Sequence, residues 1–279
     1  MRTEPQSIVS LVPSDTYNLC RLGLGDRLVG RTEYCIEPGE DVRDIEVLGG
    51  PKNPNITRIL ALEPDLVVAN QEENTQRDVE ALQRAGLDVY LSFPKTVAEG
   101  IQHVERLAAL FPSLGLQQRA RVDDARETVA ALTSRDVVAV PTFVPIWMDP
   151  LMTANGATFV SDVLELCGAR NVFSDRERRY PLAADLGLAA ALPSERVGDR
   201  DVRYPRVSEA EVIERSPRLI LLPSEPYAFT DAEEAYFRNL PLPAPHRVRR
   251  CEGQTLTWYG LRCIEGLAEL QALIDDARQ

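Results

Sequence analysis

Positive charge is scarce in this chain of 279 residues, in which 31 Lys and Arg stand against 43 Asp and Glu and give a formal net charge of −12. Nucleic-acid binding needs clustered Lys and Arg, so this balance argues against a nucleic-acid partner. The small arginine clusters within 176–179 and 247–250 are interpreted as solvated surface. Long apolar runs are also missing. None approaches the roughly 18 residues of a membrane helix, which predicts no membrane insertion.

Closely spaced cysteines are absent as well. The number of cysteines is odd, and no C-x-x-C pair occurs among Cys20, Cys35, Cys167, Cys251 and Cys263. Because zinc sites need close pairs of ligands, the sequence predicts no zinc site. Reduced and mostly buried thiols are the simpler interpretation, and they suit a cytosolic compartment.

The first residues contain no basic stretch followed by an apolar one, and no lipidation cysteine lies near the start. As written, the chain is therefore expected to be cytoplasmic, unless a secretion signal has been removed from it. Hydrophobic residues make up 44% of the chain and charged residues 27%, as in ordinary globular proteins. The length suffices for one large core or two modest ones.

Short apolar runs alternate with helical patterns in both halves of the sequence. A segment that is apolar throughout predicts a strand buried on both faces, as in a parallel sheet, and the alternation has βαβ spacing. We predict strands at 7–11, 66–69, 88–92, 136–140 and 219–222, and helices at 78–85, 159–167 and 261–277. The expected fold class is α/β, with two Rossmann-like lobes of mainly parallel sheets.

The middle of the chain has a helical pattern without a strand. Thr96 and Glu99 have the spacing of a capping box, as do the pairs Ser208/Glu211 and Thr230/Glu233. Apolar residues then recur at helical spacing along 97–111, and a second helical stretch covers 116–132. We therefore divide the chain into an N-terminal lobe (1–95), a helical bridge (96–134) and a C-terminal lobe (135–279).

The two lobes share sequence features in the same order. Residues 59–72 align with 212–225, and in each a helix stops before a proline, a buried strand follows, and the segment ends at a glutamate. Residues 9–13 likewise align with 137–141. We interpret these matches as a pseudo-repeat on either side of the helical bridge.

Ligands bind beyond the carboxyl ends of strands in open parallel sheets, and pockets are favoured between domains. Aromatic side chains in such loops suit a large planar ligand, and free N–H groups at the start of a helix suit an anionic or carbonyl group. The candidate ligand-binding residues are those of the strand-end loops: Ser14, Tyr34, Pro51, Gln71, Glu72, Trp147, Arg179, Tyr180, Glu225, Tyr227, Trp258 and Tyr259.

The order and spacing of several motifs resemble the helical-backbone (class III) substrate-binding proteins of ABC transporters, the type that takes cobalamin, siderophores and haem. The motifs are SLVPSDT (10–16), GLGDRLVG (23–30), LEPDLVV (62–68), CGARNVF (167–173) and YPRVS (204–208). The resemblance implies two Rossmann-like lobes bridged by one long α-helix, and a corrinoid, haem or ferric-siderophore ligand held between them without a covalent cofactor. The ligand-facing positions that it implies are Tyr34, Pro51, Gln71, Trp147, Tyr180, Tyr227 and Trp258.

The chain departs from this family at the positions used for docking to a permease. Family members dock through one glutamate on each lobe, but the first-lobe position is Thr57 here. The second-lobe position falls near Ala210, between Glu209 and Glu211. An ABC permease therefore remains a possible partner only, and the chain is expected to be a monomer that carries, scavenges or senses its ligand.

The alternative is an enzyme, a tetrapyrrole metal chelatase with a related two-lobed architecture. Such chemistry needs a histidine or paired carboxylates where the metal enters. Glu72 and Glu225 are a candidate pair, although two solvated glutamates are the simpler interpretation. Of the two histidines, His103 is expected on the surface of its helix, and His246 lies in a proline-rich loop. Since no nucleophile elbow or Walker A loop occurs either, binding without catalysis is the preferred hypothesis.

Overall fold

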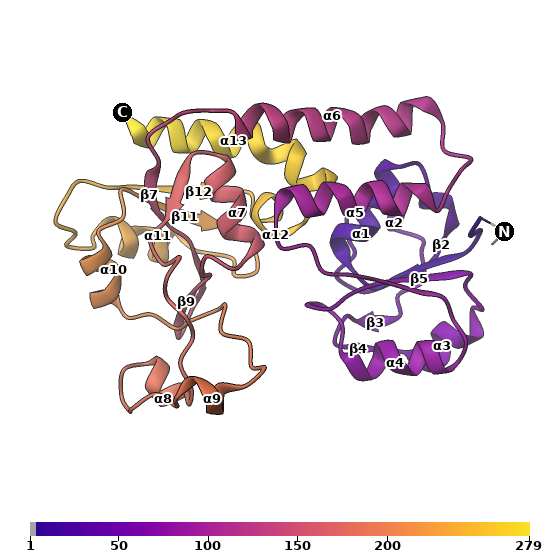
Figure 1. Ribbon diagram of the computed structural model, residues 1–279, viewed down its shortest axis with the longest axis horizontal. Helices are drawn as coiled ribbons and strands as arrows, with labels where there is room; N and C mark the ends of the chain where they lie inside the picture. Colours follow the sequence, from indigo (N-terminus) through magenta and orange to yellow (C-terminus); the bar gives the residue numbers. More distant parts are fainter. Residues whose placement is uncertain (1–3) are drawn as a thin grey trace. The chain divides into compact units, whose positions relative to one another are not determined.

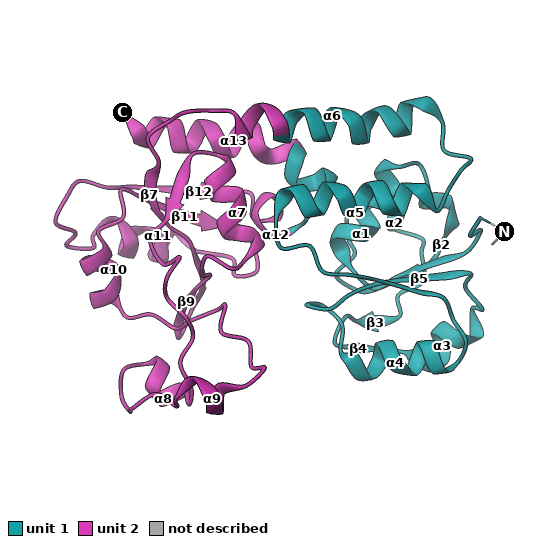
Figure 2. Ribbon diagram, viewed as in Figure 1, with its two compact units in different colours: residues 1–129, 258–264 teal, residues 130–257, 265–279 magenta. Residues whose placement is uncertain are grey.

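The computed structural model describes residues 4–279 (Figure 1). The chain divides into two compact units (Figure 2): unit 1 runs to Val129 and includes Trp258–Ile264, and unit 2 comprises Ala130–Thr257 and Glu265–Gln279. Each unit is therefore discontinuous in sequence. The segment 258–264, which lies near the C-terminus, belongs to the N-terminal unit.

Unit 1 contains a four-stranded sheet in the order β2-β1-β5-β6, with all neighbours parallel. Its strands are β1 (Ile8–Ser10), β2 (Leu28–Arg31), β5 (Leu66–Asn70) and β6 (Val89–Ser92). Between β2 and β5 the chain also forms a two-stranded hairpin of β3 (Gly49–Gly50) and β4 (Asn53–Pro54). The predicted strands at 7–11, 66–69 and 88–92 are confirmed, and every residue of β5 is buried.

Helices cover both faces of the unit 1 sheet (Figure 1). One core cluster joins β1 and β5 to α1, α5 and α6, and a second joins them to α3 and α4. The helical elements of this unit are α1 (Pro13–Arg21), η1 (Gly25–Arg27), α2 (Gly39–Val42), α3 (Ile56–Ala61), α4 (Gln76–Arg84), α5 (Val97–Ala109) and the first part of α6 (Leu116–Thr133). Residues 96–134, expected to be a helical bridge, thus form two helices, and α6 passes from unit 1 to unit 2 at Val129.

Unit 2 repeats the same parallel arrangement, in the order β10-β7-β11-β12. Its strands are β7 (Val140–Phe143), β10 (Ala169–Asn171), β11 (Leu219–Pro223) and β12 (Arg247–Cys251), with a hairpin of β8 (Pro145–Met148) and β9 (Leu151–Thr153). Its helices are α7 (Phe159–Leu166), α8 (Leu182–Asp185), α9 (Ser194–Val197), α10 (Glu209–Arg215), α11 (Asp231–Arg238), α12 (Gly253–Thr257) and most of α13 (Leu261–Arg278). The α/β class with parallel sheets is confirmed.

The pseudo-repeat between 59–72 and 212–225 has a structural counterpart. In each copy a helix (α3 or α10) leads to the third strand of its sheet (β5 or β11). The aligned residues Glu63 and Ser216, each directly before the proline, both adopt the left-handed conformation, with φ of 47° and 45°. Few non-glycine residues do so, so the same local turn occurs at equivalent places in both units.

The second proposed match, 9–13 with 137–141, is wrong in register. Pro13 is the first residue of α1, whereas Pro141 lies inside β7, so the predicted strand at 136–140 begins only at Val140. The Pro141 carbonyl accepts a hydrogen bond from the Arg218 N–H at 2.8 Å, so this proline takes part in the sheet although it has no N–H to donate.

Candidate functional site

The carboxyl ends of β5 and β6 in unit 1 meet a cluster of buried polar side chains. Asn70 ends β5 and Ser92 ends β6, and both are buried. Asp15 joins them from the first turn of α1, and Tyr259 joins them from the returning segment 258–264. Parallel strands bring residues that are distant in sequence to one edge of the sheet, which explains why these four meet.

Asp15 is the centre of this cluster and has two close partners. Its Oδ1 lies 2.5 Å from His103 Nε2, and its Oδ2 accepts a hydrogen bond of 2.8 Å from the Tyr259 hydroxyl. The side chains of Asp15 and His103 are 0% and 1% exposed. Because an ionised carboxylate only accepts hydrogen bonds, His103 Nε2 carries a proton when Asp15 is charged. Asp15 is therefore a buried acid that is held by two donors.

The Tyr259 phenol connects the cluster to the strand ends. Asn70 Nδ2 donates to its oxygen at 3.2 Å, and the Ser92 hydroxyl lies 3.1 Å from it. Burial and the adjacent Asp15 carboxylate raise the pKa of Tyr259 well above its usual value, and the Ser14 hydroxyl also bonds to the phenol. The phenol thus keeps its proton for Asp15. Ser14 and Tyr259, both predicted as ligand-binding residues, are therefore together but buried.

The expectation that His103 lies on the surface is wrong. It belongs to the buried face of α5 with Gly100 and Leu107, three residues before it and four after. Its ring packs edge-on against Tyr259, with the centroids 5.2 Å apart. Gly100, His103 and Leu107 share one face of a helix, so their spacing indicates that His103 is buried. Histidine is polar, however, and its residue type alone does not assign it to an apolar face.

The other predicted residues of unit 1 lie on loops around this edge. Asn74 donates to the Pro51 carbonyl at 3.0 Å, and Lys52 Nζ donates to the Glu72 carbonyl, so the Pro51 and Glu72 loops are joined. Gln71 is exposed beside Glu72. These contacts fix two of the predicted strand-end loops against each other.

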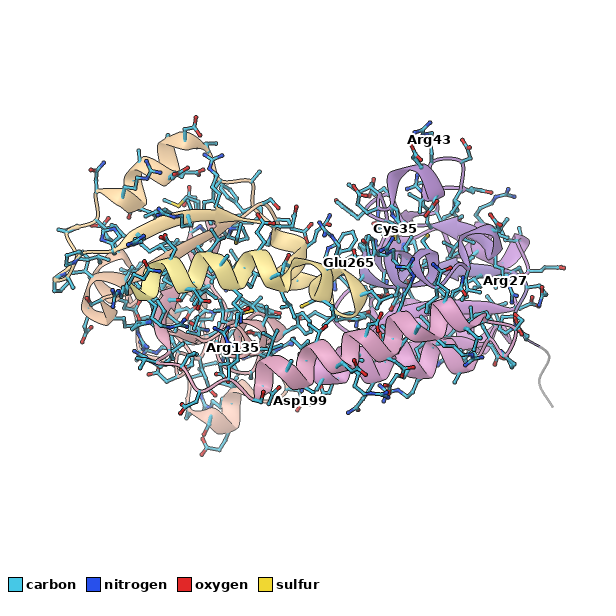
Figure 3. The ribbon with its side chains drawn as sticks, turned by 90° about the horizontal axis from the view of Figure 1, so that it is seen from above. Arg27, Cys35, Arg43, Arg135, Asp199 and Glu265 are labelled. Atoms are coloured by element: carbon cyan, nitrogen blue, oxygen red, sulfur yellow. The ribbon has the colours of Figure 1, made fainter. Side chains whose placement is uncertain are left out.

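The aromatic candidates of unit 1 differ in exposure. Tyr34 is 60% exposed in the loop after β2, whereas Trp258 is only 7% exposed and packs edge-on against Tyr17 at 6.3 Å. Cys35, which directly follows Tyr34, is buried inside unit 1 and is labelled in Figure 3, where Arg43 extends from the periphery of the same unit. Tyr34 is thus the aromatic candidate of unit 1 that has a free ring face.

Unit 2 has an aromatic cluster at the carboxyl ends of β7 and β11. Trp147, on the β8–β9 hairpin, contacts Tyr227 at 5.3 Å between centroids, and Tyr227 contacts Phe229 at 4.9 Å. Trp147 is 44% exposed, although its indole N–H donates to the Asp149 carbonyl. Two predicted residues, Trp147 and Tyr227, are thus brought into contact. Phe229 was missed because it is buried below them.

Glu225 lies next to this cluster on the loop after β11. Its Oε1 accepts a hydrogen bond of 2.6 Å from the Thr257 hydroxyl. The backbone of Gly253 approaches so closely that a Cβ there would lie 2.5 Å from the Glu225 nitrogen. Only glycine fits at residue 253, and Glu225 is thereby held against the start of α12.

Arg179 and Tyr180 belong to a separate region of unit 2, the loop between β10 and α10. The Tyr180 hydroxyl donates to the Asp201 carbonyl at 2.7 Å, and the Arg179 N–H donates to Asp185 at 2.9 Å. The Tyr180 ring also packs against Arg178 and Arg200, so these contacts of the pair are made within the same loop region and not with the Trp147–Tyr227 cluster. The predicted residues of unit 2 therefore form two groups.

The described part of the chain contains neither a cluster of metal ligands nor a helix that could span a membrane. Among residues 4–279, no group of three or more His, Cys, Asp or Glu side chains is placed to hold a metal ion. None of their helices combines the length and apolarity needed to cross a membrane. The five cysteines are free, and burial raises the pKa of the Cys20, Cys167 and Cys251 thiols to about 12.

The chain is similar to known binding proteins over most of its length. The sequence profile of the family described as "Periplasmic binding protein" matches residues 8–208. A vitamin B12-binding protein of Photorhabdus laumondii subsp. laumondii is 29% identical over 220 residues, which cover 78% of this chain and 70% of that protein. The corresponding protein of Yersinia pestis is 29% identical over 219 residues, or 78% and 69% of the two chains.

Solved structures show the same fold. The periplasmic vitamin B12 binding protein of Vibrio cholerae superimposes with a TM-score of 0.77 at 24% identity, covering 99% of both chains. A periplasmic heme-binding protein from Roseiflexus sp. RS-1, in its apo form, gives a TM-score of 0.74 at 18% identity and covers 98% of this chain and 99% of its own.

Proposed function

The chain belongs to the periplasmic binding protein family, and on this premise we propose that it binds a corrinoid, a haem or a related metal chelate. The ligand contacts the strand-end loops, and the flat aromatic side chains at those loops form its apolar walls. The four relatives described above are named as vitamin B12- or heme-binding proteins. Binding without catalysis is the function that these relatives favour over a chelatase-like enzyme.

The observation that carries this proposal is the exposed Trp147 ring held by Tyr227. An edge-on aromatic contact fixes the orientation of the indole, while 44% of the residue remains exposed. Tyr227 is itself fixed, because its hydroxyl donates to Glu233, and this hydrogen bond raises the Tyr227 pKa. A rigid aromatic surface of this kind binds a planar ligand with little loss of side-chain entropy.

Docking to a permease follows a different pattern here from that implied for the family. Thr57 is an exposed residue of α3. In unit 2, Glu209 accepts a hydrogen bond of 2.5 Å from Tyr236, and Glu211 is bonded to Ser208 and Arg176. We propose that any permease contact made by this chain uses other side chains. The expected cytoplasmic location has no support among the relatives, two of which are named periplasmic.

Titration of the purified protein with cobalamin, cobinamide, haem and ferric siderophores, followed by tryptophan fluorescence and calorimetry, tests the proposal. We expect one class to bind and Trp147→Ala to weaken it by roughly tenfold or more, since burying a large aromatic side chain contributes about 1.5–3 kcal/mol. Val138→Ala is the matched control because Val138 is 81% exposed at the opposite end of β7. No binding up to about millimolar ligand, or equal weakening by both variants, would refute the proposal.

A further inference from the structure

A hollow of about 520 Å³ lies in unit 2, in the loop region that contains α8 and α9. Its lining combines a polar and an apolar part. Leu192, Val197 and Val202 supply apolar surface, whereas the charged residues are arginines and carboxylates: Asp175, Arg176, Glu177, Arg178, Arg179 and Arg215. Four cations against two anions give this hollow a positive excess, in a chain whose net charge is −12.

Two of the four arginines already have carboxylate partners. Arg215 Nη1 lies 2.5 Å from Asp175. Arg176 is bonded to Asp185 at 3.1 Å and to Glu211 at 2.9 Å. Apart from these pairs, the lining contains Arg178, Arg179 and Glu177, so one positive charge remains in excess and it is contributed by Arg178 and Arg179.

Arg178 and Arg179 both carry side-chain N–H donors that have no acceptor among residues 4–279, as their contacts show. The guanidinium of Arg178 packs 4.8 Å from the centre of the Tyr180 ring, and its buried Nε has no hydrogen-bond acceptor among residues 4–279. Arg179 is exposed, and within the same range its side chain takes part in no hydrogen bond or ion pair. Arg200 adds a further cation, 5.3 Å from the Tyr180 ring.

Hydrogen bonds to Asp185 and to the Val202 carbonyl fix the backbone that carries these arginines. Asp185, 2% exposed, accepts hydrogen bonds from the Arg179 N–H at 2.9 Å and the Arg206 N–H at 2.8 Å, besides its ion pair with Arg176. Arg178 N–H donates to the Val202 carbonyl at 2.7 Å. A fixed backbone lowers part of the entropy cost of capturing a ligand, so the two arginines start from fixed positions on the chain.

We propose that this hollow binds a carboxylate or phosphate group through Arg178 and Arg179. Guanidinium groups form paired, charge-assisted hydrogen bonds with both kinds of oxyanion. The oxyanion is either an acidic side group of the bound tetrapyrrole or a separate small anion. The first source rests on the proposed function, whereas the second is independent of it.

The first experiment titrates the full chain with pyrophosphate and with citrate by calorimetry at low salt. We expect binding to the wild-type protein and a loss of roughly tenfold or more in Arg179→Gln, because the variant removes a charge-assisted hydrogen bond to the anion. Arg196→Gln is the matched control: it removes the same charge from the exposed face of α9, outside the lining of the hollow. It should bind as the wild type does.

The second experiment compares haem, which carries two free propionates, with its dimethyl ester. If the acid of the ligand occupies the hollow, haem binds more tightly than the ester, and Arg179→Gln abolishes the difference while Arg196→Gln retains it. If a separate anion occupies it, only the first experiment shows an effect of Arg179→Gln.

Failure of the two proposals can be told apart. A protein that binds pyrophosphate through Arg179 but binds no tetrapyrrole supports the anion site and refutes the proposed function. A protein that binds haem and its ester equally in all variants, and binds neither pyrophosphate nor citrate, refutes the anion site alone. Equal losses in Arg179→Gln and Arg196→Gln also refute it, because they show only a general effect of net charge.

Discussion

At the scale of single residues, the structure places a carboxyl group where water cannot reach it. Burying an ionised carboxylate is costly unless hydrogen bonds replace its water. Asp15 meets this requirement through His103 and Tyr259, with the Asn18 amide at 3.4 Å as a further contact. Each of these partners comes from a different part of the chain, so the cluster fastens α1, α5 and the segment 258–264 together.

Replacing His103 tests this role. His103→Ala leaves Asp15 Oδ1 with only the long contact to the Asn18 amide and leaves a void beside Tyr259. We therefore expect unit 1 to lose about 3 kcal/mol or more of its free energy of unfolding. Gln102→Ala changes the adjacent, exposed residue of α5 and should cost under about 0.5 kcal/mol. Urea unfolding followed by circular dichroism measures both. Similar midpoints for the two variants would show that the buried pair is dispensable.

At the scale of elements, hydrogen-bonded caps fix where the helices of unit 2 begin. Complete capping boxes occur at Ser208/Glu211 for α10 and at Thr230/Glu233 for α11, as the sequence predicted. The third predicted box is only half formed. The Thr96 hydroxyl accepts a hydrogen bond from the Glu99 N–H, but the Glu99 carboxylate accepts one from the backbone N–H of Lys95 and not from that of Thr96. Glu211 also binds the buried Arg176, so the cap of α10 is joined to the loop that carries Arg178 and Arg179.

The Glu211 carboxylate in the capping box of α10 should make the free energy of unfolding depend on pH in the acidic range. Burial raises the pKa of Glu211, but the hydrogen bonds from Ser208 and Arg176 outweigh it and hold the pKa below the ordinary 4.5. Its stabilising effect is therefore complete above pH 4.5 and is lost as the pH falls through the lower folded-state value. Glu211→Gln should cost roughly 1 kcal/mol at neutral pH and flatten the loss of stability below pH 4.5.

The measurement is the free energy of unfolding between pH 3 and pH 7. Glu214→Gln is the control, since Glu214 is exposed on the same helix and lies outside the capping box. The steepness of the acid transition should be unchanged in that variant. An unchanged slope in Glu211→Gln as well would contradict the assigned role of the carboxylate.

The elements that could be predicted from sequence were those with a local signal. The strands β5 and β11 are apolar up to their last residue, and a proline lies two residues before each, so their class and position followed directly. The strand β12 was not predicted, because its sequence RVRRC is mostly basic and only Val248 is buried. Its arginines are paired with acids on neighbouring helices, Arg247 with Asp276 and Arg250 with Glu234. An edge strand that carries salt bridges has the same composition as a solvated loop.

At the scale of the whole molecule, the units do not correspond to continuous stretches of sequence. Unit 1 needs Trp258–Ile264, whose Tyr259 and Leu261 are buried in it. The hydrogen bond between Tyr259 and Asp15 joins residues that are 244 positions apart. No local pattern predicts such a pair, which is why the strand-end loops were predicted but the buried cluster was not. The Trp147–Tyr227 contact was accessible to prediction, because both residues follow strands of one sheet.

A shortened chain tests the discontinuity of unit 1. Residues 1–129 alone lack Tyr259 and Leu261, so we expect them to unfold without a cooperative transition or at a much lower temperature. The same residues joined to 258–264 through a glycine-serine linker should regain a cooperative transition, because the segment then completes the core and satisfies Asp15. Thermal melts followed by circular dichroism compare the two chains. Identical melts would show that unit 1 is complete without the returning segment.

The return of Trp258–Ile264 to unit 1 also sets a time order for biosynthesis. After Val129 the ribosome adds 129 residues to reach Trp258 (258 − 129), which takes roughly 6–26 s at about 5–20 residues per second. During that interval the nascent N-terminal unit lacks its last piece, with Asp15 still short of one donor. Its native state thus becomes available only after Ile264 has been made, and until then the emerging polypeptide is open to chaperones.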